Sequence, residues 1–477
     1  MQSTQLAAKK REESLQSANP VVETMASLLR SALAQTPGDA SFQAVEQNAL
    51  ALCNEVTRLV LERQLQAIAD SLPDEIMIGG RAYRRHETGW VKYHSLCGEL
   101  NVRRATYRLL GVRNGPTVVP LDLRAGLISR GTPALAFSVA QGFAMGPLRD
   151  YEAEMAAAHR QPPSRSTLER LAKSVGKQVK DDVAVMEAVV RANEAVPEDA
   201  HAISMGLDRT TVPMAEERPR SKWEPSPKKR RRRPRVRRAP HPIEVNYRMA
   251  YVGTVSVTDR RGEVLVTRRY AATADEGPDE VVYRMMQDVR ALRRERGLPL
   301  AIVQDGAPEL WNLLRDALRA AGVKDWVEII DIFHMREHVS QLLDLVPSRQ
   351  SKQKWLRRLE KDNRTVSHLL GLIERKMRSS PPPFSPALFT QWSYLQGHSR
   401  RTRYASFKQR GFAIGSGVTE GACKSLVMMR TKRSGQRWRP DGVTAALTLR
   451  ALLQSDRLNS VWGLFRQRFV HEVNALN

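Results

Sequence analysis

The sequence predicts a mixed α/β protein built from more than one domain. Its 477 residues exceed what one compact core usually holds. Apolar residues recur three and four apart before residue 75, which indicates helices, and then alternate with polar residues up to about residue 110. Between residues 200 and 334, short apolar runs alternate with amphipathic stretches. This pattern is typical of a sheet covered by helices.

The balance of charge favours an acidic polymer as the partner. The chain has 76 Lys and Arg against 51 Asp and Glu, a formal net charge of +25, and a pI near 10.4. We expect double-stranded DNA to be bound. Cys53, Cys97 and Cys423 lack the paired spacing of a zinc site or a disulfide framework. No apolar run has the roughly 20 residues of a membrane span, so a cytoplasmic, nucleoid-associated protein is expected.

The first two regions are helical and then extended. Residues 1–74 form an N-terminal helical region, in which residues 1–18 are expected to be disordered and the rest to pack or to oligomerise. Residues 75–130 form a small basic β-element with a turn at Gly79-Gly80. Its buried face is expected to carry Leu100, Val102, Ala105 and Tyr107. The basic face of this element either contacts a DNA backbone or is merely solvated.

Residues 131–199 have the sequence pattern of a helix-turn-helix unit whose last helix continues as a connecting helix. Two helices end at residues 145 and 159, a turn follows at Gln161-Pro162-Pro163, and Ser164 caps a last helix. A connecting helix covers residues 179–193. We expect DNA contacts on the last helix, from Arg165, Arg170 and Lys173.

Residues 200–334 contain the first part of an α/β core. A strand at 203–207 ends on Asp208, and two alternating strands follow at 247–257 and 263–270. After a helix, apolar strands at 300–304 and 327–330 end on Asp305 and Asp331. Three strands, a helix, then strand and helix repeated is the order of a ribonuclease-H-like fold.

Two insertions interrupt this core. The first, 216–242, is expected to be a disordered loop that grips DNA, although a merely solvated loop is the alternative. Its basic run contains Lys228, Lys229, Arg230, Arg231, Arg232 and Arg233. The second, 335–412, is a helical insertion. The core resumes at 413–440, and residues 441–477 are expected to be two further amphipathic helices.

The stretch Gly415 to Trp438 predicts a glycine-lined turn and a helix. Ser416 is the expected N-cap, and Glu420 lies in the first turns. Trp438 either stacks on a base or packs. The basic residues expected to hold backbone phosphate are Lys424, Arg430, Lys432, Arg433 and Arg437.

Asp208, Asp305 and Glu420 together suggest a metal site. Each acid alone has an ordinary explanation, as a strand-end cap, a turn residue or a helix-dipole partner. Because they are far apart in sequence, only a fold would unite them. Three hard oxygen donors suit two Mg²⁺ ions, with Mn²⁺ as a substitute, and two such ions catalyse phosphodiester cleavage and transfer.

The chain resembles the DDE transposases of bacterial insertion sequences of the Kra type, which are related to Mutator-like transposases. The resemblance spans roughly residues 75–465. It rests on Gly206-Leu207-Asp208, Gln304-Asp305-Gly306-Ala307 with Trp311, and Asp331-Ile332-Phe333-His334 with Glu337-His338. The most specific motif is Gly415 to Lys424, followed by Met429 to Trp438.

The resemblance implies a ribonuclease-H-like core in which Asp208, Asp305 and Glu420 are the catalytic metal ligands. Asp331 and His334 would support the active site, or be purely structural. The implied protein binds the terminal inverted repeats of its element, cleaves the ends and transfers the 3′-hydroxyl to target DNA as a homodimer or larger assembly. The alternatives are a ribonuclease-H-like nuclease without strand transfer and a catalytically silent DNA-binding regulator.

Overall fold

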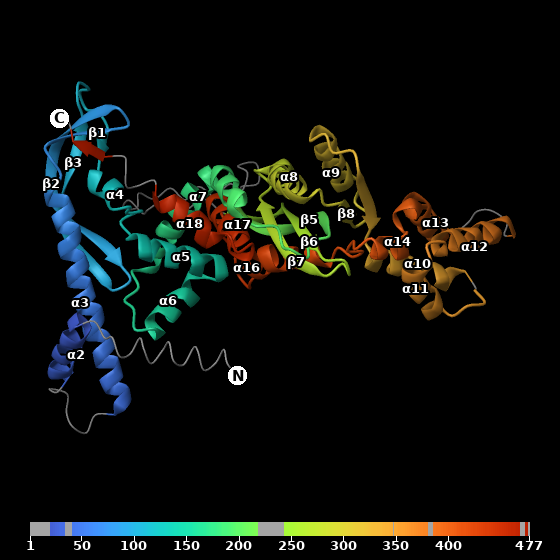
Figure 1. Cartoon of the computed structure of the whole chain (residues 1–477), viewed down its shortest axis with the longest axis horizontal. Coiled ribbons are helices and arrows are strands. Elements are labelled where there is room, and N and C mark those ends of the chain that lie inside the picture. The colour runs from blue at the N-terminus through green and yellow to red at the C-terminus, as the bar shows by residue number, and fades with distance from the viewer. Residues whose placement is uncertain are drawn as a thin grey trace, which may run out of the picture. The chain divides into compact units, whose positions relative to one another are not determined.

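The protein is described here by a computed structural model, shown in Figure 1, which covers residues 20–33, 41–217, 243–346, 348–379, 385–467 and 473–475. It is a mixed α/β protein with two sheets. The chain divides into two compact units. Unit 1 comprises residues 1–139, 148–171 and 468–477, and unit 2 comprises residues 140–147 and 172–467. The predicted basic run 228–233 lies outside the described residues.

Unit 1 is built on an antiparallel five-stranded sheet in the order β10-β1-β2-β3-β4. The strands are β1 (Glu75–Ile78), β2 (Arg81–Ser95), β3 (Gly98–Leu109), β4 (Thr117–Val118) and β10 (Val473–Ala475). The expected apolar face of β3 is confirmed, because Leu100, Val102, Ala105 and Tyr107 are buried.

Unit 1 also contains helices that precede or follow these strands in the sequence. They are α2 (Pro20–Leu33), α3 (Phe42–Asp70), α4 (Pro120–Arg124) and α6 (Leu148–Ala157). Side chains of α3 accept hydrogen bonds from backbone amides of β3. Gln66 accepts a hydrogen bond from the Arg103 amide at 2.8 Å, and Glu62 accepts one from the Asn101 amide at 2.7 Å.

Helices α5 (Pro133–Met145) and α7 (Arg165–Asn193) contain residues of both units. The predicted last helix and its continuation as a connecting helix form the single helix α7 of 29 residues. Residues 158–164 separate α6 from α7, which is more than the three or four residues of a helix-turn-helix turn.

Unit 2 contains a five-stranded sheet in the order β7-β6-β5-β8-β9. The pairs β7–β6 and β6–β5 are antiparallel, whereas β5–β8 and β8–β9 are parallel. The strands are β5 (Ala202–Glu217), β6 (Ile243–Thr258), β7 (Val264–Ala272), β8 (Leu300–Gln304) and β9 (Trp326–Ile330). The predicted end of the first strand at Asp208 is wrong, since β5 continues for nine further residues along β6.

Both faces of this sheet are covered, which explains why its strands are largely apolar. The helices α8 (Gly277–Arg296) and α9 (Pro308–Ala320) share one core with Ile203, Met205 and Leu207 of β5. On the opposite face, the even-numbered residues Val212 and Met214 pack against the Glu420-bearing helical segment and α17 (Pro440–Gln454).

The helical insertion predicted at 335–412 is present, and Figure 1 shows its helices gathered to the right of β8. It contains α10 (Ile332–Leu345), α11 (Lys352–Lys361), α12 (Thr365–Ser379), α13 (Pro386–His398), the 3₁₀ turn η2 (Ser399–Arg401) and α14 (Tyr404–Gln409). The chain then returns to the sheet through α15 (Gly417–Ala422), the π-helix η3 (Cys423–Met428) and α16 (Met429–Thr431).

The C-terminal region only partly matches the two predicted helices. Both α17 and α18 (Leu458–Gln467) are present, but the chain then forms β10, which pairs with β1. A strand of three residues carries too short a pattern to be predicted from sequence. Among the described residues, no helix has the length and apolar character to cross a membrane.

Candidate active site

Parallel strands place three acids side by side at one edge of the unit 2 sheet. Ile203 to Met205 of β5 pair with Leu300 to Ile302 of β8, so Asp208 and Asp305 lie at the same level, three residues further along. Gln304 pairs with Ile330, and the Asp331 amide donates to the Gln304 carbonyl at 2.7 Å. The carboxyl ends of parallel strands are the usual place for a site in such a sheet.

Glu420 reaches this edge because α15 lies directly against β5. A Cβ added to Gly206 would stand 2.3 Å from the Thr419 hydroxyl, so only glycine permits this approach. Thr419 is also within 2.7 Å of the Thr254 hydroxyl on β6. Two neighbouring strands therefore fix the residue that precedes Glu420.

Asp331 is the centre of a buried hydrogen-bond network. One carboxylate oxygen accepts from the His334 amide at 2.8 Å and lies 3.2 Å from its ring Nδ1. The other accepts from the Ser416 amide at 2.5 Å and from its hydroxyl at 3.0 Å. Because Asp331 is fully buried and both oxygens are engaged, it joins α10 to the turn before α15.

Ser416 occupies the predicted N-cap position before α15. Its side chain makes no capping bond to the helix backbone. The hydroxyl lies 2.7 Å from a Glu420 carboxylate oxygen as well as 3.0 Å from Asp331. A hydroxyl carries one proton and can donate to only one of the two carboxylates at a time. Ser416 is therefore the direct link between Asp331 and Glu420.

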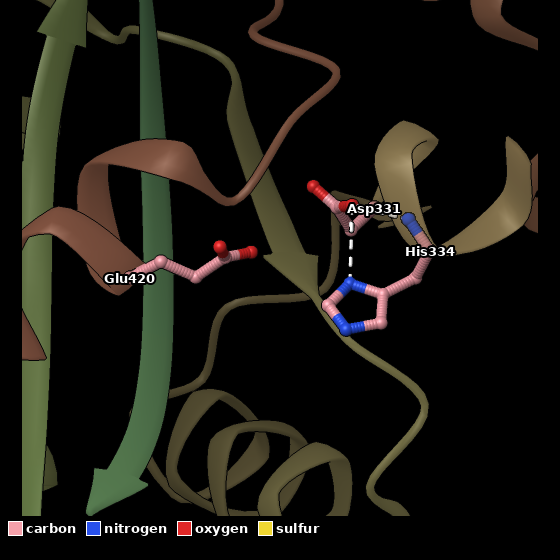
Figure 2. Close-up of side chains that lie close together, drawn as sticks. All are labelled: Asp331, His334 and Glu420. Carbon is pink, nitrogen blue, oxygen red and sulfur yellow. Dashed lines mark hydrogen bonds and ion pairs between the residues drawn. The ribbon is translucent and has the colours of Figure 1, made fainter. Parts of the chain in front are cut away.

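Figure 2 shows Glu420 on one side, facing Asp331 and His334 from the start of α10 on the other. Each offers one ligand atom, and these atoms all lie within 4.8 Å of one another. Asp208 and Asp305 are not in that tightest group, but they are near enough to interact electrostatically with it. Support by Asp331 and His334 was predicted for this site, whereas their close grouping with Glu420 was not.

The acids perturb one another and their neighbours. Burial raises the pKa of Asp208, hydrogen bonds from the Arg209 amide and Cys423 oppose this, and the charges of Asp305 and Glu420 raise it further. Burial would also raise the pKa of Asp331, but the bonds from His334 and Ser416 outweigh burial and lower it. The same bond to Asp331 raises the pKa of His334 to about 9, against the effect of burial.

The π-helix η3 brings a thiol to Asp208. Cys423, at its first position, is buried and donates to an Asp208 carboxylate oxygen at 3.3 Å. Burial raises the pKa of this thiol, and the nearby Asp208 raises it further, so it remains protonated. Single π-helical turns within α-helices are often found at functional sites. No signal in the sequence distinguished this turn from ordinary helix.

Trp311 and the helical insertion support Asp305. The Trp311 indole donates to the Asp305 carbonyl at 2.8 Å, and the Arg401 guanidinium lies over the Trp311 ring, 4.7 Å from its centroid. Tyr394 of α13 lies against Gly306, where a Cβ would be 3.0 Å from the tyrosine ring. Its hydroxyl is buried and has no hydrogen-bond partner among the described residues. The sequence analysis did not identify Tyr394, because no local pattern connects α13 to Asp305.

The donors at this edge fit divalent magnesium. Asp208, Asp305 and Glu420 supply carboxylate oxygens, the ligand type that Mg²⁺ prefers. Burial is the main cause of the raised pKa of Asp208, and the charges of Asp305 and Glu420 raise it further; a bound cation would offset both effects. The Cys423 thiol would not compete as a ligand while it remains protonated.

The predicted phosphate-binding residues after Glu420 do not behave alike. Lys424, Lys432, Arg433 and Arg437 are exposed. Arg430 is only 2% exposed: it donates to the Phe143 carbonyl at 2.9 Å and lies between the Phe143 and Trp438 rings. The prediction that Arg430 holds phosphate is therefore wrong, since its guanidinium is a packing element. Trp438 packs, which is the second of its two predicted alternatives.

The predicted DNA-binding residues on α7 have intramolecular partners. Arg165 is exposed and forms an ion pair with Glu152 at 2.8 Å. Arg170 is exposed and donates to the Thr167 hydroxyl at 3.4 Å. Lys173 is half-buried and lies 3.3 Å from Asp441. DNA contact by these three residues stays a prediction.

No protein-family model and no curated protein sequence matches this chain.

Proposed function

We propose that this protein is a Mg²⁺-dependent DNA transposase with a ribonuclease-H-like catalytic core. One observation carries the proposal: Asp208, Asp305 and Glu420 come from three distant segments and lie close enough to interact electrostatically, beside the carboxyl end of β8. The sheet there has antiparallel strands on one side and parallel strands on the other. The strand order, with the first strand in the centre and the insertion before the Glu-bearing helix, supports the ribonuclease-H-like assignment.

The rest of the chain fits a polyanionic substrate. The net charge of +25 favours nucleic acid over an uncharged or cationic ligand. Lys424 and Lys432 are exposed on the segment that carries Glu420. In the proposed function, the N-terminal part of the chain recognises the element ends, and two copies act together on two ends.

Each side chain has a definable role in this chemistry. Asp208, Asp305 and Glu420 would hold the metal ions, which when bound activate the attacking oxygen and stabilise the departing one. Asp331 and His334 act as positioning residues, because they hold the Ser416 turn from which Glu420 projects. Cys423 orients Asp208 by donating to one oxygen.

The test uses a supercoiled plasmid that carries the DNA flanking the coding sequence, incubated with the full chain and Mg²⁺. The wild type should nick this DNA and join the new 3′-hydroxyl to a second plasmid. Glu420→Gln and Asp305→Asn should lower cleavage at least 100-fold while DNA binding is retained. Asp316→Asn, an exposed acid on α9, is the matched control and should cleave like the wild type.

Metal binding gives a readout that needs no DNA sequence. Titration with Mn²⁺, followed by electron paramagnetic resonance, should show sites that are weakened in Asp208→Asn and Asp305→Asn but kept in Asp316→Asn. Cutting without joining would favour a nuclease. Equal cleavage by the wild type and Glu420→Gln would reject the assigned triad. DNA binding without Mn²⁺ sites or cleavage would favour a silent regulator.

A further inference from the structure

The helical insertion concentrates positive charge beyond what its own acids neutralise. Residues 335–412 contain 16 Lys and Arg but only 5 Asp and Glu. These helices belong to unit 2. A concentration of like charge destabilises a folded domain unless an anion compensates it, so this surface needs a physical explanation.

One groove runs between β9 and the segment from α13 to α14. Its volume is about 770 Å³, and its lining includes Trp326, Glu328, Arg400, Arg401, Arg403 and Phe407. Glu328 is already engaged by Arg315 and Arg401, each at 2.7 Å. Arg400 and Arg403 are exposed and have no acidic partner among the described residues. The groove therefore has two uncommitted guanidinium groups.

A second groove lies on the other side of α14. Its volume is about 400 Å³, and it is lined by Arg336, Arg357, Glu360, Lys361 and Lys408, with Ala405 and Gln409 from α14. Glu360, its single acid, is shared by Arg336 and Lys408. Arg357 and Lys361 are exposed and have no acidic partner among the described residues.

The α14 helix contributes residues to both grooves, and α11 contributes residues to the second. Phe407 lines the first groove and the next residue, Lys408, lines the second. On α11, Trp355 and Leu359 are buried, whereas Lys354, Arg357 and Lys361 are exposed. The last three are spaced three and four apart, so they form one row on a helix face. Rows of separated cations match the repeated charges of a phosphodiester backbone.

We propose that these two grooves bind the backbone of double-stranded DNA. The helical insertion is then a second DNA-binding surface, in addition to the site of Asp208, Asp305 and Glu420. Arg400 and Arg403 contact phosphates in the first groove, and Arg357 and Lys361 contact phosphates in the second. The contacts carry no base specificity, because phosphate contacts position a duplex without reading its sequence. The choice of DNA as the polymer rests on the proposed function.

The experiment measures binding of the full chain to a fluorescein-labelled 30-base-pair duplex of arbitrary sequence by anisotropy across a range of salt concentrations. Arg400→Gln/Arg403→Gln and Arg357→Gln/Lys361→Gln each remove two charges. Each should reduce the slope of log affinity against log salt by about 1.8, since one lost phosphate contact removes about 0.9.

The matched control is Arg375→Gln/Arg378→Gln on α12. It removes the same charge from exposed residues of the same insertion that line neither groove. Its slope should equal that of the wild type. Thermal unfolding of all variants should coincide, because the substituted groups have no acidic partner among the described residues. Groove variants that behave like the control would overturn the proposal.

Other outcomes separate this proposal from the proposed function. If the wild type cleaves and joins DNA while the groove variants keep its full salt slope, the function stands and the grooves are not DNA sites. If the groove variants lose slope although no cleavage is found, the grooves stand and the transposase assignment fails. If the variants lose binding to poly-glutamate but not to the duplex, the partner is an acidic protein and the DNA assignment is overturned.

Discussion

Two tyrosine side chains near Asp305 and Asp331 differ in whether their hydroxyl groups form a hydrogen bond. Tyr404 and Tyr394 both come from the helical insertion and both have buried hydroxyl groups. The Tyr404 hydroxyl donates to the Ile330 carbonyl at 3.0 Å, directly before Asp331. The Tyr394 hydroxyl has no partner among the described residues. The two tyrosines therefore form a natural pair for comparison.

We expect Tyr404→Phe to lower the free energy of unfolding by about 1–3 kcal/mol, because it leaves the buried Ile330 carbonyl unpaired. Tyr394→Phe should change it by less than about 0.5 kcal/mol or stabilise the protein, since no bond is lost. Urea unfolding of both variants and the wild type measures the difference. Equal destabilisation by the two substitutions would contradict the assigned hydrogen bonding.

Close contact between α15 and β5 determines the position of Glu420. The α15 helix approaches β5 at Gly206, where any side chain would collide with Thr419. Gly421, one residue after Glu420, has free space around its Cα and ordinary helical geometry. A side chain is therefore excluded at Gly206 but not at Gly421.

Gly206→Ala should push α15 away from the sheet, lower cleavage at least tenfold and cost about 1–3 kcal/mol of stability through overpacking. Gly421→Ala is the control: alanine favours helix over glycine by about 1 kcal/mol, so stability should rise or stay unchanged. Urea unfolding and the plasmid-nicking reaction test both variants. Wild-type cleavage by Gly206→Ala would mean that α15 does not depend on this contact.

The carboxylate of Glu328 on β9 connects that strand to α9 and η2 through ion pairs. Burial would raise its pKa, but hydrogen bonds from Arg315 on α9 and Arg401 on η2 outweigh burial and lower the pKa from 4.5 to about 2. A lowered pKa means that the stabilising contribution is fully present above pH 4.5. It is lost as pH falls through about 2.

Accordingly, Glu328→Gln should be destabilised relative to the wild type at pH 6, and this difference should shrink as pH falls from 4.5 towards 2. Urea unfolding at several pH values between 6 and 3 measures it. All other acids are common to both proteins, so their titration cancels. A difference that stays constant over this range would show that the ion pairs of Glu328 contribute nothing.

At the scale of the whole molecule, two strands far apart in the sequence pair in one sheet. Val473 to Ala475 pair with Ile76 to Ile78, nearly 400 residues earlier in the sequence. Without β10, β1 would become an edge strand with unpaired backbone groups on one side.

A chain that ends at Gln467 should therefore show faster amide hydrogen exchange in β1, at the amides that face β10. The strand β8 in unit 2 provides the internal control and should exchange at the wild-type rate. Mass spectrometry of peptides covering 75–78 and 300–304 distinguishes the two strands. Unchanged protection of β1 would contradict the pairing.

The sequence by itself determined the features that depend on neighbouring residues. Continuous apolar runs located the strands that end before Asp305 and Asp331, and residues 335–412 were predicted to be helical without bounds for the separate helices. The charge of +25 also follows from composition alone. Periodicity and charge are local or additive properties, so no knowledge of the fold is needed to obtain them.

Tertiary structure decided what depends on residues far apart in sequence. It gave the hydroxyl of the N-cap residue Ser416 two carboxylate partners in place of a capping bond. It buried Arg430 between aromatic rings and brought Cys423 to Asp208 through a π-helical turn. It also extended β5 past Asp208, because pairing with β6 continues beyond the end of β8. Each outcome depends on packing between segments separated by tens to hundreds of residues, which no local pattern encodes.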